Sequence, residues 1–340
     1  MLMHINGDTA GMRISTITQV ARRRTGIKTM RQFRQRIITF SITCSALAAA
    51  MFASPAAGLA GPAPQAAHEA LTPRIAPYEI TYRISLKEAQ ERAGIVLADG
   101  SLFSRLEGGA CAGWSTTSGM KVRFVFRREG VRETESRVIS WESDDGNQFI
   151  SRIERLLNGA PVERIRARAE RAAPGLPFRL SLKLPEKRSA LLPPDTLFPT
   201  AALKKLLRAA ASGKRTLSML LYEGDEELSP QHVVAIIGKK RAPLTSARDT
   251  GAAAAAVPEA LRGLAYWPVS LAYYGPIRRA DGSKPDEKEQ EAARFGLPEY
   301  EVHFRLYENG ITGEATLVYP DYTLKAAVEK VRLLPEEKCR

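Results

Sequence analysis

The sequence has few of the residues from which metal sites and catalytic centres are built. Its 340 residues include only three cysteines, Cys44, Cys111 and Cys339, and four histidines. A structural zinc site takes four Cys or His ligands, and no C-x-x-C or H-E-x-x-H spacing is present. Phosphate-binding glycine loops and the G-x-S-x-G elbow are also missing. We therefore expect no metal, no cofactor and no catalytic residue.

Long apolar runs are scarce as well, and the clearest one is Ile37 to Ala53. A basic segment, Arg31 to Arg36, precedes it, and small residues follow it. This order is typical of a secretory signal peptide, so we expect residues 1–60 to be cleaved off near Ala60, with Met30 as an alternative start. The run is short for a spanning helix of about 20 residues, although an uncleaved anchor is the alternative. We expect a soluble mature form with no transmembrane helix.

The charge balance is only mildly basic without this segment. The full chain has 50 Lys and Arg against 37 Asp and Glu, a net charge of +13. Residues 1–60 hold eight of the basic and one of the acidic residues, which leaves +6 for the remainder. So small an excess does not require nucleic acid, which an exported protein would rarely meet. Anionic envelope components stay open as partners.

Alternating apolar and polar residues dominate the chain from Tyr78 onward, which predicts half-buried strands. Such segments flank short turn sequences, of which Asn-Gly and Asp-Gly favour the positive φ angles of tight hairpins. These turns are Asp99-Gly100, Glu129-Gly130, Asn158-Gly159 and Asn309-Gly310. A repeated strand–helix–strand pattern is missing. The sequence therefore predicts consecutive antiparallel hairpins and not a doubly wound sheet.

One segment, Thr200 to Ser212, has helical periodicity and predicts an amphipathic helix. Thr216 to Tyr222 and Val233 to Ile237 then predict another hairpin. The predicted fold is mostly β: a long antiparallel, spiral or curved sheet of consecutive hairpins with one helix packed on it. We expect a flexible, Ala- and Pro-rich lead-in at residues 61–77 and a single β-rich domain over residues 78–340.

With Cys44 in the signal peptide, two cysteines remain, and a lone pair in an exported protein predicts one disulfide between Cys111 and Cys339. The alternative is a nucleophilic Cys111 with His303 as its base. His232 and His303 both lie beside strand residues, where structural histidines are more typical than ligands or bases.

Three carboxylates, Glu142, Asp144 and Asp145, follow Trp141. Glycosidases need two carboxylates that face one cleft, and acidic clusters can bind calcium. Consecutive residues at a strand end rarely face each other, and the spacing does not match an EF-hand. We therefore expect a solvated hairpin turn here.

An arginine stripe is a candidate surface for an anionic polymer, a lipid head group or an acidic protein. Arg164, Arg166 and Arg168 alternate on one predicted strand, with Arg152 and Arg155 on its expected partner. The alternative is an ordinary exposed sheet face on which glutamates alternate with the arginines.

Aromatic residues make up only 7% of the chain, and four of them suggest a further use. Phe124, Phe126, Trp141 and Phe149 inside a curved sheet could line a concavity that holds lipid. A packed core is the alternative.

Seven short segments occur in a fairly specific order. They are Gly113-Trp114, Trp141-Glu142 with Asp145-Gly146, Leu197 to Thr200, Trp267-Pro268-Val269, Pro298 to Glu301, Asn309-Gly310-Ile311, and Tyr319 to Tyr322. With the cysteine pair, they make the chain from about Tyr78 to Cys339 resemble the EipB-like family of periplasmic cell-envelope integrity proteins from alphaproteobacteria. The segments Ala252–Ala256 and the charged loop near Lys284 depart from that pattern.

The resemblance implies a spiral of antiparallel strands, a periplasmic location, the Cys111–Cys339 disulfide, and a role in envelope integrity and stress tolerance. It implies a tetratricopeptide-repeat protein of the periplasm as a partner, and no catalytic residues. The sequence thus favours a non-catalytic periplasmic protein that binds a protein, lipid or glycan component of the envelope. The alternatives are a lipid or lipoprotein carrier and an envelope hydrolase.

Overall fold

The structure, a computed structural model, describes residues 74–244, 258–275 and 296–337. The chain divides into two units, Met1–Thr39 and Phe40–Arg340, and all described residues belong to the second. The predicted signal peptide, most of the lead-in and Cys339 lie outside the described residues.

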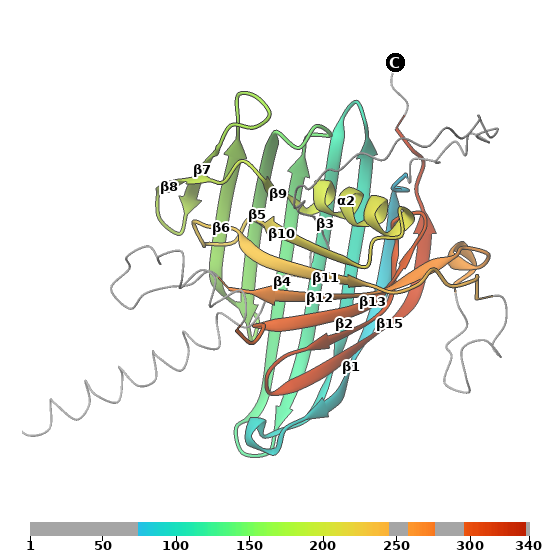
Figure 1. Ribbon diagram of the computed structural model, residues 1–340. Coiled ribbons are helices and arrows are strands. Elements are labelled where there is room, and N and C mark those ends of the chain that lie inside the picture. Colours follow the sequence, from blue (N-terminus) through green and yellow to red (C-terminus); the bar gives the residue numbers. More distant parts are fainter. Residues whose placement is uncertain (1–73, 245–257, 276–295, 338–340) are drawn as a thin grey trace, which may run out of the picture. The chain divides into compact units, whose positions relative to one another are not determined.

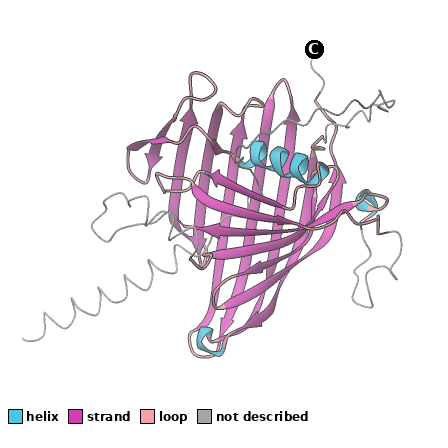
Figure 2. Cartoon of the chain, in the orientation of Figure 1, coloured by secondary structure: helices cyan, strands magenta, loops and turns pink. Residues whose placement is uncertain are grey.

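Fifteen strands of the described residues form one curved sheet (Figures 1 and 2). In chain order they are β1 (Tyr78–Ala89), β2 (Ile95–Gly109), β3 (Gly113–Phe126), β4 (Gly130–Glu142), β5 (Gln148–Leu157), β6 (Ala160–Glu170), β7 (Phe178–Leu184), β8 (Arg188–Leu192), β9 (Thr196–Leu197), β10 (Thr216–Leu221), β11 (Gln231–Ile237), β12 (Tyr266–Tyr274), β13 (Tyr300–Tyr307), β14 (Thr312–Val318) and β15 (Tyr322–Leu333). One α-helix, α2 (Pro199–Ala211), and two short 3-10 helices, η1 (Glu91–Ala93) and η3 (Glu259–Leu261), complete the described elements.

The sheet extends in both directions from its middle. β1 lies between β2 and β15, and the neighbouring strands follow in sequence order to β8 on one side and to β9 on the other. The pair β9 and β10 is parallel, whereas the other neighbouring pairs are antiparallel. This arrangement confirms the predicted fold class, with the first and last strands joined side by side.

The two ends of the sheet come together in one buried cluster. Phe198, just before α2, stacks on Phe149 of β5 with 4.6 Å between ring centroids. It also meets Phe178 of β7 edge-on at 4.9 Å, and Tyr222 after β10 belongs to the same cluster. Burial of these large aromatic surfaces is a major stabilising contribution. The sheet therefore curls into a spiral in which the segment after β8 packs on the inner face of β5 to β7.

A second run of aromatic side chains crosses the sheet. Tyr273, Tyr300, Tyr319, Tyr322 and Phe124 follow one another with centroid separations of 4.3, 6.0, 4.8 and 5.6 Å. They come from β12, β13, the turn after β14, β15 and β3. The first three contacts join adjacent segments of the sheet, whereas the last joins β15 to β3, which β1 and β2 separate in the strand order, so the sheet is curved here.

Helix α2 agrees with the predicted Thr200–Ser212 to within one residue at each end. Its apolar face, which includes Leu203, Leu206 and Leu207, is buried. In the described part of the chain, no helix is long and apolar enough to cross a membrane.

One predicted turn is wrong. Asp99-Gly100 lies inside the continuous strand β2, where a Cβ on Gly100 would overlap the carbonyl oxygen of Lys121 on β3. Glycine is therefore needed there for the close approach of two strands and not for a turn. The other three turns connect strands as predicted, and Asn158 and Gly159 have φ angles of 51° and 80°.

Packing begins before Tyr78, where the ordered domain was expected to start. Ile75 is buried, and the Ala76 N–H donates a hydrogen bond of 3.0 Å to the carbonyl oxygen of Asn309. Strands β7, β8 and β9 were not predicted from the sequence; they are short and lie between prolines.

Candidate functional site

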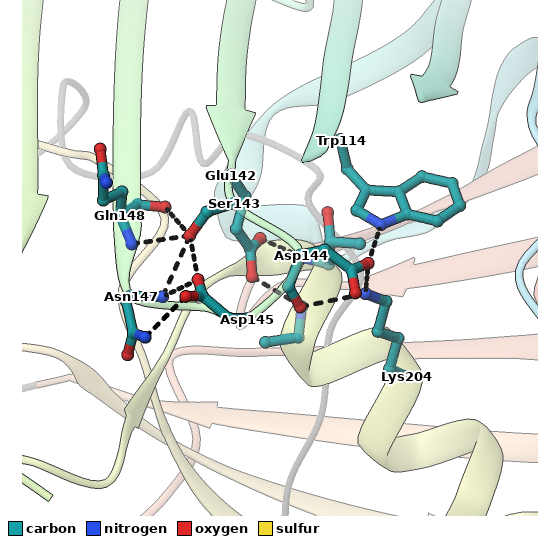
Figure 3. A network of polar contacts seen from close by, with 10 residues as sticks. Trp114, Glu142, Ser143, Asp144, Asp145, Asn147, Gln148 and Lys204 are labelled. Atoms are coloured by element: carbon teal, nitrogen blue, oxygen red, sulfur yellow. Dashed lines mark hydrogen bonds and ion pairs between the residues drawn. The ribbon is translucent and has the colours of Figure 1, made fainter. Parts of the chain in front are cut away.

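The amino end of α2 is fixed by a carboxylate from a distant strand. Glu142, the last residue of β4, is buried and accepts hydrogen bonds from the N–H groups of Thr200 and Ala201 at 2.7 and 2.8 Å (Figure 3). The first N–H groups of a helix lack partners within the helix, and a negative charge there is favoured by the helix dipole. Glu142 therefore acts as the cap of α2. The prediction that it belongs to a solvated hairpin turn is wrong for this residue, which is buried.

Burial raises the pKa of Glu142 to about 7, although its two N–H donors and the nearby Lys204 favour the charged form. A raised carboxyl pKa is common among general acids, but a general acid must reach a substrate. Only 3% of Glu142 is exposed, and both of its oxygens contact the helix backbone. The carboxyl group is thus engaged in holding the helix.

Asp144 extends the same network. Its carboxylate accepts a hydrogen bond of 2.7 Å from the Trp114 Nε1–H and forms an ion pair with Lys204 (Figure 3). The Lys204 ammonium lies 5.3 Å from the centre of the Trp114 ring, within range of a cation–π interaction. Burial acts to raise the pKa of Asp144, but the bonds from Lys204 and Trp114 hold it below its usual value. Asp144 is therefore a charged link between β3 and α2.

Asp145 organises the turn between β4 and β5. It accepts hydrogen bonds from the Ser143 hydroxyl at 2.6 Å and from the Asn147 backbone N–H at 3.0 Å (Figure 3). These bonds lower its pKa. The three carboxylates of this segment thus bind three different partners and do not face one cleft, so the arrangement is not that of a glycosidase.

Cys111 lies just before Trp114 and is part of a disulfide. Its expected partner, Cys339, lies outside the described residues, so the pairing stays a prediction. The described end of the chain comes close, because a Cβ on Gly109 would lie 3.2 Å from the carbonyl oxygen of Glu337. A disulfide-bonded Cys111 has no free thiol for the alternative role as a nucleophile.

The two described histidines are each bound to a serine of a neighbouring strand. The distance is 2.7 Å both from His232 Nε2 to Ser218 Oγ and from His303 Nδ1 to Ser270 Oγ. In residues 74–244, 258–275 and 296–337, no group of three or more His, Cys, Asp or Glu is placed to hold a metal. These contacts agree with the interpretation of both histidines as structural residues.

The arginine stripe is partly neutralised by its neighbours. Arg164 pairs with Glu154 at 2.8 Å, and Arg168 pairs with Glu170 at 2.7 Å. Arg155 does not belong to the stripe, since it is buried on the other face and pairs with Glu163. Residues three positions apart on a strand point to opposite faces, which separates Arg155 from Arg152.

The four aromatic residues proposed for a concavity divide between two faces. Phe124, Phe126 and Phe149 are buried in packed clusters, whereas Trp141 is half-buried and donates from Nε1 to the carbonyl oxygen of Ala112 at 2.9 Å. Trp141 and Glu142 are consecutive, so one side chain points outward and the other inward.

Sequence reasoning missed Trp114 and Lys204 as members of the network around Glu142. Thr200, whose N–H Glu142 caps, lies 58 positions further along the chain. A carboxylate next to an aromatic residue at a strand end has no local signature that identifies such a distant partner.

Comparisons with known proteins agree with the family expectation. A model of EipB-like proteins matches residues 69–335. The chain is 27% identical over 279 residues to the cell envelope integrity protein EipB of Brucella abortus (strain 2308), covering 81% of this chain and 89% of that protein. The crystal structure of a β-barrel-like protein of a domain of unknown function, from Brucella abortus, shares the fold with a TM-score of 0.66 and 23% identity, over 77% of this chain and 99% of the other. The chain belongs to the EipB-like family.

Proposed function

We propose that this chain is a non-catalytic periplasmic protein that supports the integrity of the cell envelope and its resistance to envelope stress. It does so by binding a protein, lipid or glycan component of the envelope. The observation that carries the proposal is the similarity, over 81% of the chain, to a protein named for cell envelope integrity.

The geometry supports a binding role, because the side chains that could act as a nucleophile or a general acid are bonded to other parts of the fold. Glu142 caps α2, Asp145 organises a turn, and Cys111 is in a disulfide. A nucleophile or general acid needs a free, substrate-facing group. These residues contribute stability to the part of the sheet that holds α2.

A periplasmic location is supported by two features. The first 60 residues have the basic, apolar and small segments of a signal peptide, with cleavage proposed near Ala60 and Met30 as an alternative start. A disulfide at Cys111 suits an oxidising compartment, and we propose Cys339 as its partner.

The outer face of the sheet supports a protein partner, for which we propose a periplasmic tetratricopeptide-repeat protein. Ile139 and Ile150 are 57% and 39% exposed on neighbouring strands, next to exposed arginines of the stripe such as Arg152 and Arg168. Arginine is enriched at protein interfaces, and exposed apolar patches can mark them. Arg164, Arg166 and Arg168 are the proposed contacts for acidic groups of such a partner.

Deletion and complementation in the source organism test this function. Cells without the gene should lose survival in detergent and under cell-wall antibiotics, and the wild-type gene should restore it. Chemical crosslinking in intact cells, with Cys111→Ser as the comparison, should capture the partner. Full survival of the deletion strain under every envelope stress would refute the role in envelope integrity.

A further inference from the structure

An open cleft of about 360 Å³ lies at the carboxyl end of α2, the end opposite to the Glu142 network. Four cationic side chains, Lys214, Arg215, Lys239 and Lys240, line it beside Trp267. In Figure 1 this is the region where α2 turns back into β10, next to the end of β11. We call these four residues and Trp267 the basic cleft.

Strand pairing brings the four cations together. In the antiparallel pair β10–β11, Thr216 lies opposite Ile236, and the Ile237 N–H donates to the Arg215 carbonyl oxygen at 2.8 Å. Lys214 and Arg215 precede β10, and Lys239 and Lys240 follow β11, so the two basic pairs meet at one end of the strand pair.

Gly238 fixes the path of the chain on the second side of the cleft. Its N–H donates to the Pro268 carbonyl oxygen at 2.7 Å, and a Cβ there would lie 2.9 Å from that oxygen. Only glycine fits this close approach without a shift of the backbone. The contact places Lys240 over the buried Trp267 ring, with 5.1 Å from Nζ to the ring centre. One wall of the cleft is therefore joined to β12 by a backbone hydrogen bond.

The positive charge of the cleft is largely uncompensated. Lys240 pairs with Glu308 at 3.0 Å, whereas Lys214, Arg215 and Lys239 form no ion pair with a carboxylate of the described residues. Like charges held close together repel each other. Four cations against one carboxylate thus leave a local excess that an anion would relieve.

Capping of the carboxyl end of α2 does not explain why these cations lie in the cleft. The Lys214 N–H bonds to the Ala209 carbonyl oxygen at 3.0 Å and the Gly213 N–H to that of Ala210 at 3.1 Å, with a φ of 76° at Gly213. This Schellman arrangement already satisfies the last carbonyl groups. The helix dipole favours a cation such as Lys214 here, but Lys239 belongs to a different segment.

A larger cleft elsewhere is lined by a cation that is already bonded within the fold. It measures about 510 Å³ and is lined by Arg171. The Arg171 guanidinium donates to Asn147 Oδ1 at 2.6 Å and to the Pro194 carbonyl oxygen at 2.8 Å, and it stacks on Phe178 at 4.3 Å. That cation is engaged by the fold, unlike those of the basic cleft.

We propose that the basic cleft binds a phosphate group, either of a lipid head group or of a soluble envelope metabolite. Lysine ammonium groups bind phosphate as point charges, and an exposed cluster of them suits a ligand with more than one negative charge. The volume falls within the range of small-ligand sites. This inference rests on the proposed function, because it names a chemical class for the envelope component that is bound.

The test compares two double variants of the mature, disulfide-bonded protein. Lys214→Glu with Lys239→Glu reverses two cleft charges, and both residues are exposed. Lys183→Glu with Lys187→Glu is the matched control, since both lysines are exposed near the turn between β7 and β8, do not line the cleft, and give an equal change in net charge. Calorimetric titration with pyrophosphate probes a soluble ligand. Flotation with phosphatidylcholine vesicles, with and without phosphatidylglycerol, probes a lipid head group.

We expect the wild-type protein to bind pyrophosphate, the phosphatidylglycerol vesicles, or both. The cleft variant should lose at least roughly tenfold in affinity and the control variant less than about twofold, because close charges dominate in such a site. Binding of only one probe identifies the source of the phosphate. Equal losses in both variants, or no binding of either probe by the wild type, would overturn the proposal. If the wild type binds neither probe but deletion of the gene still reduces survival under envelope stress, the proposed function stands without this site.

Discussion

The two ends of α2 differ in how their charges are used. At the amino end, Glu142 and Asp144 each bind partners within the fold, and Lys204 is paired. At the carboxyl end, Lys214 and Lys239 line an open cleft without a carboxylate partner among the described residues. The same helix therefore has one end that is held by the sheet and one that presents charge to the outside. Residues at the first end should govern stability, and residues at the second should govern binding.

The largest expected effect concerns the covalent link next to the amino-end network. Cys111 and its proposed partner Cys339 are 228 positions apart. The chain-entropy model gives such a bond up to about 5 kcal/mol of stability. We expect Cys339→Ser, or reduction, to lower the melting temperature and increase proteolysis. An unchanged melting curve would show that this link does not stabilise the fold.

The cap of α2 comes next. Glu142→Ala leaves the N–H groups of Thr200 and Ala201 without their acceptor and opens a void, which together should cost roughly 3–4 kcal/mol in the free energy of unfolding. Urea denaturation at neutral pH measures this. Glu142→Gln is the control, because its amide oxygen can still accept one bond and should lose clearly less. Equal losses in the two variants would argue against capping as the role of Glu142.

The same residue predicts a dependence of stability on pH. Its pKa is about 7 in the folded protein and near its usual value of 4.5 when unfolded. Between these values the unfolded chain has released the proton and the folded protein retains it, so stability falls as the pH rises. The loss should be roughly 3 kcal/mol, complete above pH 7 and absent below 4.5. From pH 4.5 to 7 the melting temperature of the wild type should fall relative to that of Glu142→Gln, which has no proton to lose at this position. An unchanged difference between the two melting temperatures would contradict the prediction.

A smaller effect is expected for Asp144→Asn. The variant loses the charge that pairs with Lys204 and weakens the bond from Trp114. Because Asp144 is partly exposed, solvent screens the pair, and we expect about 1 kcal/mol. A double-mutant cycle with Lys204→Met would give the coupling energy directly. A coupling energy of zero would show that the ion pair between Asp144 and Lys204 does not help to hold α2 on the sheet.

The smallest effect on stability belongs to the other end of the helix. Lys214→Glu with Lys239→Glu should stay within about 0.5 kcal/mol of the wild type, since exposed residues without ion pairs contribute little. Chemical denaturation checks this. A large loss would mean that the carboxyl end is also part of the structural framework, and the contrast between the two ends would fail.

The sequence predicted the sheet well because period-two patterns and Asn-Gly turns are local signals. The helix at α2 followed from its apolar spacing and was placed to within one residue. Gly100 was misread because a glycine needed for close strand approach looks the same in sequence as a turn glycine. Arg155 was placed with Arg152, although strict alternation puts residues three apart on opposite faces.

The candidate sites were harder to predict, because their parts are distant in the sequence. Glu142 finds its partner only when β4 and α2 come together, and nothing local marks that contact. The basic cleft did have a signal: Lys214-Arg215 and Lys239-Lys240 lie just outside the two strands of a predicted hairpin, so pairing must bring them together. Its third side, Trp267, depends on the packing of Gly238 against Pro268, which the sequence does not reveal.

Complementation of deletion cells with the two double variants tests the division between the ends of α2 most directly. Survival in detergent is measured with each variant present at the abundance of the wild-type protein. We predict that Lys214→Glu with Lys239→Glu fails to restore survival, whereas Lys183→Glu with Lys187→Glu restores it. Equal and full restoration by both variants would contradict a functional role for the basic cleft.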